Sequence, residues 1–120
     1  MLFYANKHEM NYLWYFQKMP RDVYHRALAY LLTLDEVCCE HISEIYNFEK
    51  QEIIPDALSK AWNTSTSLKT MRLAFNLFTG HTRWSNDESP DLLSPSELFC
   101  SEYMMYYLEA IRIRYPEYVV

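Results

Sequence analysis

The chain has very little of the residue that builds tight turns. Among its 120 residues there is one glycine, Gly80, and there are five prolines. Sandwiches and barrels of short strands need frequent turns rich in Gly and Pro, so this composition argues against both architectures. A single glycine also cannot build a Gly-rich phosphate loop, which excludes the common nucleotide-binding folds.

The chain also lacks a concentrated run of Lys and Arg, and its formal net charge is -5. Proteins that bind DNA or RNA through the phosphate backbone usually carry a basic face. Direct nucleic-acid binding is therefore disfavoured, and a basic protein is the partner that the charge favours.

Long apolar runs are missing as well. No stretch approaches the roughly 20 residues that a bilayer-spanning helix needs. Lys7, His8 and Glu9 stand too near the start of the sequence for a signal peptide. We therefore expect a soluble protein of the cytoplasm with no membrane partner.

Cysteine is scarce and odd in number, with Cys38, Cys39 and Cys100. An odd set argues against a disulfide framework and fits a reducing cytoplasm. Neighbouring side chains on a helix point about 100° apart, so Cys38 and Cys39 cannot easily bind one ion together with His41. We predict no metal and no cofactor, with thiols that act as small buried hydrophobes.

Two cysteine–histidine pairs keep a cryptic enzyme open as a third hypothesis. A nucleophilic Cys needs a His within hydrogen-bond reach, and sequence cannot show that adjacency. The pairs are Cys39 with His25 and Cys100 with His81. No other motif in the sequence indicates catalysis, so we predict a protein that is not an enzyme.

Hydrophobic and aromatic residues are abundant. Half of the residues are hydrophobic and 17% are aromatic, including eleven tyrosines. Aromatic rings bury a large area each, and a chain of this length can form a sound core without disulfides or metal. The sequence therefore predicts one domain over residues 1–120.

The clearest single element is a helix over residues 65–79. Thr64 to Ser67 offer side-chain oxygens for the first turn. Leu68, Met71, Phe75 and Phe78 then recur on one helical stripe. Gly80 can adopt the left-handed conformation that often closes a helix.

Similar start and stop signals predict an all-α fold. Asn6 and Asp35 stand as caps before apolar-periodic segments, and Ser94 with Glu97 forms the pattern of a capping box. Pro20 and Asp22 open the second helix, because Pro is tolerated in a first turn and Asp favours the positive end of the helix dipole. The predicted helices span residues 6–18, 21–34, 36–47, 65–79 and 95–114. The last is apolar on nearly all sides, so we expect it and the 65–79 helix to be central. Residues 48–55 are predicted to connect helices, and residues 81–93 to form a polar loop.

A row of acidic residues marks the third predicted helix. Glu36, Glu40 and Glu44 stand at i, i+4 and i+8, and like charges at this spacing cost a helix roughly 0.2–0.5 kcal/mol per pair. Such a row either faces a basic groove of a partner or is a solvated face that keeps the domain soluble. We take the row as the candidate partner-binding surface.

A second candidate surface lies at the start of the 65–79 helix. Thr64, Ser65, Lys69 and Arg72 could hold an anion at the helix N-terminus. Capping by the hydroxyls and an ion pair of Arg72 explain the same residue types. An RNA- or anion-binding module is therefore the alternative hypothesis.

The aromatic load leaves one more question open. Trp62, Trp84 and the tyrosines exceed what one small core readily holds. Surplus aromatics often mark a protein interface, including that of a homodimer, although tyrosines at the edge of a core look the same in sequence. The sequence leaves oligomeric state open.

Several segments together resemble a known family. They are residues 23–28, 45–49, 54–58, 62–67, 72–80 and 108–112, which read VYHRAL, IYNFE, IPDAL, WNTSTS, RLAFNLFTG and LEAIR. This set resembles a family of small uncharacterised proteins found in Gram-positive bacteria and their phages, plasmids and conjugative elements. The resemblance covers roughly Asp22 to Tyr115 and implies a mobile-element setting but no established activity.

The leading hypothesis combines this setting with the acidic surface. Short acidic proteins of mobile elements often resemble inhibitors of host defence, including anti-CRISPR proteins that block Cas nucleases. We therefore predict a non-enzymatic protein-binding protein, most concretely an anti-CRISPR-type inhibitor of a basic host nuclease such as a Cas protein.

Overall fold

The computed structural model of the protein describes residues 1–82, 84 and 93–118. Its elements in chain order are α1 Asn6–Phe16, α2 Val23–Leu34, α3 Glu36–Glu40, α4 Ile42–Ile45, β1 Tyr46–Asn47, β2 Glu52–Ile53, the 3-10 helix η1 Pro55–Ser59, α5 Ser65–Thr79, α6 Pro95–Leu98, α7 Met104–Arg114 and the 3-10 helix η2 Pro116–Tyr118. The prediction of an all-α fold is confirmed. Most of the predicted 81–93 loop, residues 83 and 85–92, lies outside the described part of the chain.

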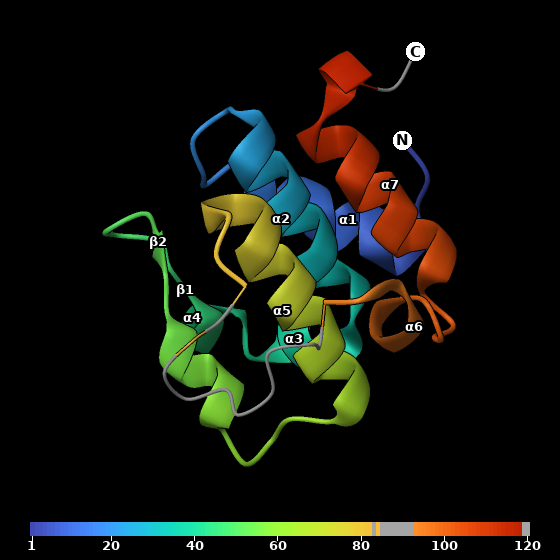
Figure 1. The fold of residues 1–120 in the computed structure, drawn as a ribbon. Coiled ribbons are helices and arrows are strands. Elements are labelled where there is room, and N and C mark those ends of the chain that lie inside the picture. The colour runs from blue at the N-terminus through green and yellow to red at the C-terminus, as the bar shows by residue number, and fades with distance from the viewer. Residues whose placement is uncertain (83, 85–92, 119–120) are drawn as a thin grey trace.

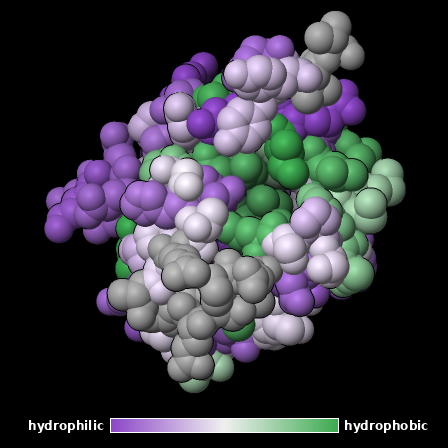
Figure 2. Space-filling view, in the orientation of Figure 1, coloured by the Kyte–Doolittle hydropathy of each residue, from purple (hydrophilic) through white to green (hydrophobic). Residues whose placement is uncertain are grey.

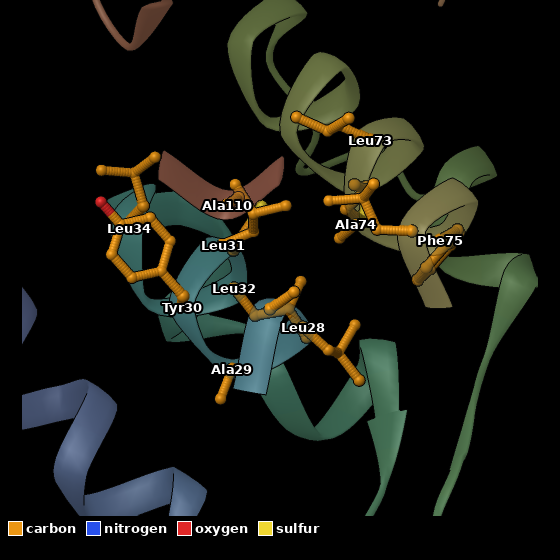
Figure 3. Packing of buried hydrophobic residues seen from close by; sticks show 14 of the residues in the cluster. Leu28, Ala29, Tyr30, Leu31, Leu32, Leu34, Leu73, Ala74, Phe75 and Ala110 are labelled. Carbon is orange, nitrogen blue, oxygen red and sulfur yellow. The ribbon is translucent and has the colours of Figure 1, made fainter. Parts of the chain in front are cut away.

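Helix α2 is the centre of the bundle. It packs against α1, α3, α5 and α7, and Figure 1 shows it between these helices. Every residue from Ala27 to Asp35 is buried. Figure 3 shows Leu31 of α2 among side chains of α5 and α7, with Ala74 and Ala110 near it. The prediction that the last helix is central is wrong, because α2 carries the longer buried run.

Helix α5 has the predicted bounds and the predicted signals. The Thr64 hydroxyl accepts a hydrogen bond from the Ser67 N–H at 3.0 Å, and the Ser67 hydroxyl accepts one from the Thr64 N–H at 2.8 Å. This reciprocal pair is a capping box that satisfies donors of the first turn. At the other end the Gly80 N–H donates to the Asn76 carbonyl at 2.7 Å.

Gly80 has a positive φ of 82°, so its replacement tests the helix end. A Cβ at this position would meet no atom within 4 Å, so only backbone strain opposes a side chain. We expect Gly80→Ala to lower the free energy of unfolding by about 1 kcal/mol, because L-residues disfavour this conformation. Gly80→Asn should lose less, since Asn tolerates it better. Urea unfolding measures both, and an Ala variant as stable as the wild type would contradict this conformation.

Helix α1 begins at the predicted residue and ends two residues early, whereas helix α2 begins two residues late and ends at the predicted residue. Ala5, not Asn6, is the N-cap of α1, and no side chain caps that end. Helix α1 ends at Phe16 rather than at residue 18, because a tighter turn brings Met19 into the core. Helix α2 begins at Val23, and its cap is Asp22, whose carboxylate accepts the His25 N–H at 2.8 Å.

The predicted helix over residues 36–47 is broken. Helix α3 ends before His41, which has φ -111° and ψ 23°, and α4 gives way to an antiparallel pair of short strands. The Asn47 side chain accepts the N–H groups of Glu49 and Lys50 and so stabilises the turn between the strands. Tyr46 is fully buried in the extended conformation, and its burial outweighs continuation of the helix.

The predicted helix over residues 95–114 is also broken. Helix α6 ends at Leu98, and α7 begins at Met104. The Ser94 side chain forms no cap hydrogen bond, so the predicted capping box is absent there. Between the helices the chain turns, the Ser101 hydroxyl accepts the Tyr103 N–H at 2.9 Å, and Leu98 and Tyr103 are both buried. A straight helix would have pointed these two side chains in different directions.

The apolar character of α7 is largely at the surface. Met104, Met105 and Leu108 are exposed, whereas Tyr107 and Ala110 are fully buried. Figure 2 shows hydrophobic residues gathered over the face that α5 and α7 form. This face contains a shallow groove of about 280 Å³. Whether this face joins two copies of the chain in a homodimer stays an open question.

Candidate functional site

An open cleft of about 430 Å³ lies where the start of α1, the end of α2, α3 and the segment before α7 meet. Its lining residues are Tyr4, Ala5, Lys7, His8, Asn11, Thr33, Leu34, Glu36, Cys39, Glu40, Glu102 and Tyr103. The cleft thus joins three parts of the chain that are far apart in sequence. We call this site the acidic cleft.

Asp35 positions the acidic wall of the cleft. This residue is extended, with φ -86° and ψ 129°, so it ends α2 and redirects the chain into α3. Its buried carboxylate accepts the Cys38 N–H at 3.0 Å, as the sequence predicted for a cap. The first helical turn after the cap carries Glu36, and the next carries Glu40. Both carboxylates therefore line the same cleft.

Carboxylates outnumber cations in the lining. Glu36, Glu40 and Glu102 face one Lys, Lys7, which leaves an excess of two negative charges at neutral pH. The Lys7 ammonium lies 3.6 Å from a Glu36 carboxylate oxygen, and both side chains are about three-quarters exposed, at 75% and 73%. An ion pair this exposed contributes little to stability, so Glu36 can form a contact with a partner protein at little cost. The cleft is therefore an attractive site for a cationic group.

His8 forms the floor of the cleft and is only 3% exposed. The Tyr4 N–H donates to its Nδ1 at 3.1 Å, so the proton sits on Nε2, which donates to the Tyr30 carbonyl at 2.9 Å. Burial lowers the pKa of His8, although the bond to the Tyr30 carbonyl acts in the opposite direction. Both ring nitrogens are thus engaged by the backbone. His8 is suited to fastening the N-terminal segment rather than to moving protons.

Cys39 also faces the cleft and is half-buried. Burial raises the pKa of its thiol, and the carboxylates of Glu40, Asp35 and Glu36 add to the rise against the opposing effect of Lys7. A thiol with a raised pKa is a weak nucleophile near neutral pH. The neighbouring His8 has no free nitrogen to activate it.

The two pairs suggested for an enzyme lie in different surroundings. His25 pairs with Asp22 and packs edge-on against Tyr46 and Phe78, away from the residues that line the cleft. Cys100 is exposed, and the His81 ring packs near Trp84. No hydrogen bond joins either predicted pair among the residues that the structure describes.

Glu44 is separated from the other two predicted carboxylates. The break at His41 turns α4 away, and Glu44 does not line the cleft. Its carboxylate accepts a hydrogen bond from His41 Nδ1 at 2.7 Å and one from the Trp62 ring N–H at 3.4 Å. The His41 and Trp62 rings stack with their centres 4.2 Å apart, so the three side chains form a cluster separate from the cleft. Glu44 therefore does not continue the row of Glu36 and Glu40, because the predicted helix is broken, and its part in partner binding stays a prediction.

The alternative site at the start of α5 is mostly occupied by its own capping contacts. The Thr64 hydroxyl is engaged with the Ser67 N–H, and the Lys69 ammonium lies 3.4 Å from the Cys100 carbonyl oxygen. Ser65 is exposed, and Arg72 is half-buried with a partner of its own. Anion binding at this end stays a prediction, and the geometry does not favour it.

Sequence reasoning did not find Glu102, Tyr103, Lys7 and Asn11. Glu102 and Tyr103 fall inside the predicted 95–114 helix, and only the break before α7 directs them to the cleft. Lys7 and Asn11 lie one turn apart on α1, which has no sequence signal for binding. No local pattern could have joined these residues to α3.

Two further properties bear on the chemistry of the described residues. No group of three or more His, Cys, Asp and Glu side chains among them is arranged to hold a metal ion. Within the same part of the chain, no helix combines the length and the apolarity that crossing a bilayer requires.

Comparison with known proteins gives a family and no activity. The model of DUF6075, a family of unknown function, matches residues 1–120. No curated protein and no solved structure matches the chain.

Proposed function

The chain belongs to the DUF6075 family, whose function is unknown, so we propose a function from the acidic cleft. We propose that the protein is a non-enzymatic binding protein of the cytoplasm. It holds a basic surface of a partner protein against Glu36, Glu40 and Glu102. The convergence of these three carboxylates on one concave site carries the proposal.

The charge of the cleft would act mainly on encounter and specificity. Complementary charges steer a basic partner toward the site and raise the association rate, while exposed pairs add little affinity by themselves. The exposed ring of Tyr4, which lines the cleft, supplies apolar area for the affinity. In 0.1 M salt the Debye length is about 10 Å, so added salt screens these charges and should slow association.

The most concrete form of the proposal is an anti-CRISPR-type inhibitor encoded by a mobile element. A Cas nuclease binds nucleic acid in a positively charged channel, and an acidic protein surface can occupy such a channel. The acidic cleft and the resemblance to proteins of phages, plasmids and conjugative elements support this form.

Charge reversal tests the proposal directly. We expect the protein to inhibit DNA cleavage by one member of a panel of purified Cas nucleases. The triple variant Glu36→Lys, Glu40→Lys, Glu102→Lys should weaken that inhibition at least about 100-fold, because like charges at an interface cost several kcal/mol. The control triple Glu49→Lys, Glu52→Lys, Glu117→Lys has the same net charge, changes only exposed residues outside the cleft and should inhibit like the wild type.

The control variant distinguishes loss of the cleft from a general effect of the changed net charge. Equal losses in the two triple variants would contradict the cleft as the binding site. If no nuclease is inhibited, a photo-crosslinking residue placed at Asn11 in the cleft, compared with one at Gln51 outside it, tests the broader claim in cells. A basic protein captured from Asn11 alone supports a binding role. Equal capture from both positions would count against it.

A further inference from the structure

We infer that the acidic cleft receives an arginine side chain of the partner protein. This inference rests on the proposed function and names the group that the cleft recognises. It depends on three features of the cleft: carboxylates without a buried ion pair, a hydroxyl without a partner on the largely buried Tyr103, and two tyrosine rings.

The carboxylates and the space suit one side chain. Glu40 and Glu102 form no ion pair with any residue that the structure describes, and Glu36 has only the exposed contact with Lys7. The volume of about 430 Å³ lies in the lower part of the range of small-molecule sites, roughly 300–1,000 Å³. A single long side chain with a polar head fits such a site better than a folded segment does.

Tyr103 provides an independent sign that a ligand is missing. The residue lines the cleft and is only 7% exposed. Its hydroxyl forms no hydrogen bond within the described part of the chain and is not among the fully enclosed polar atoms. Because Tyr103 is otherwise almost fully buried and lines the cleft, we take the cleft as the space that this hydroxyl faces. Burial raises the pKa of the Tyr103 hydroxyl above its ordinary value. The hydroxyl therefore stays neutral, and its oxygen can accept a hydrogen bond from a guanidinium.

The aromatic lining favours a guanidinium over an ammonium. The Tyr4 and Tyr103 rings pack edge-on at 5.3 Å, and both line the cleft. A planar guanidinium stacks on a ring and donates to carboxylates at its edge, whereas an ammonium is a compact, strongly hydrated charge. Arg114 of the same chain shows this combination of a ring contact and a hydrogen bond. Its guanidinium lies 3.8 Å from the Tyr24 ring centre, and its Nε donates to the Leu77 carbonyl at 2.8 Å.

Titration of the full chain with short peptides tests this inference. The probes are acetyl-Gly-Arg-Gly-amide, the same peptide with citrulline or with lysine, and spermidine, each followed by NMR on isotope-labelled protein at low salt. We expect the arginine peptide to shift the resonances of Glu36, Cys39, Glu40 and Glu102. The citrulline peptide, which is neutral and of the same shape, should bind at least about 10-fold more weakly, and lysine and spermidine about 3-fold more weakly.

A matched pair of variants tests the hydroxyl. Tyr103→Phe removes only the oxygen and should weaken the arginine peptide about 3-fold. Tyr106→Phe also contacts Tyr4 but lies outside the cleft, so it should leave binding unchanged. Citrulline, lysine or spermidine binding as tightly as arginine would overturn the inference, as would shifts outside the cleft. If charge reversal still abolishes inhibition in that case, the proposed function stands and only the arginine preference falls.

Discussion

Replacing Leu31 by alanine should lower the free energy of unfolding by about 2–5 kcal/mol. Leu31 is fully buried in the middle of α2, which contacts α1, α3, α5 and α7. The truncation removes buried methyl groups and leaves a cavity that rigid neighbours cannot fill. The loss is a large share of the roughly 5–15 kcal/mol that stabilises a typical domain. The melting temperature should fall on the order of 10–20 °C.

Leu13→Ala is the matched control for this prediction. It removes the same atoms from a helix, but Leu13 lies on the outer side of α1 and is 59% exposed. Its free energy of unfolding should change by less than about 0.5 kcal/mol. Urea unfolding of both variants gives the comparison, and similar losses at the two positions would show that α2 is not the centre of the core.

Replacing His8 by glutamine should lower the free energy of unfolding by about 1–3 kcal/mol at pH 8. The imidazole accepts the Tyr4 N–H, donates to the Tyr30 carbonyl and packs against the Phe3 and Tyr30 rings. A glutamine side chain cannot keep both hydrogen bonds in the same geometry, and each buried group left unpaired is costly. Urea unfolding at pH 8 measures this loss.

The same variant should change the dependence of stability on pH. The pKa of His8 is lowered in the folded protein from its ordinary value of 6.5, so the unfolded chain binds the proton more tightly. Stability contributed by neutral His8 is complete above pH 6.5 and is lost as the pH falls toward the lower pKa of the folded state. The difference between the wild type and His8→Gln should therefore be largest at pH 8 and shrink in acid.

His81→Gln is the control for the pH effect, because His81 is exposed. This variant should keep the acid loss of the wild type. A His8→Gln variant whose stability runs parallel to that of the wild type from pH 8 to pH 5 would show that His8 does not titrate as its burial implies.

The sequence predicts α5 correctly because both of its ends are decided locally. Thr64 and Ser67 cap the start with side chains three residues apart, and Gly80 closes the end in a left-handed conformation. Helix α2 follows the same logic, since Asp22 and Asp35 cap the helices that follow them. Where short-range hydrogen bonds determine the boundary, the sequence contains the answer.

The broken helices show where local reasoning fails. Nothing near His41 forbids a continuous helix, and the break follows from burial of Tyr46 in the bundle. Likewise, only the joint burial of Leu98 and Tyr103 favours a turn over a straight helix. These are contacts between distant parts of the chain, which a periodic pattern cannot reveal.

The residues of the acidic cleft also fall into two groups, those that the sequence predicts and those that it does not. Glu36 and Glu40 were predicted because their spacing on one short helix is visible in the sequence. Glu102 and Tyr103 were not, because about 60 residues separate them from α3 and only the turn before α7 directs them there. Glu44 belongs to the same row in the sequence, but the break at His41 removes it from the cleft, and periodicity alone does not reveal that break.

The discontinuous origin of the acidic cleft limits what a fragment of the protein can imitate. A synthetic peptide copied from residues 35–45 would carry Glu36 and Glu40 without Glu102, Tyr4 or Tyr103. As a free peptide of eleven residues it would also be too short to hold a helix in water. Linear mimics should therefore fail to reproduce the proposed binding, and antibodies that recognise this site should not bind the denatured chain.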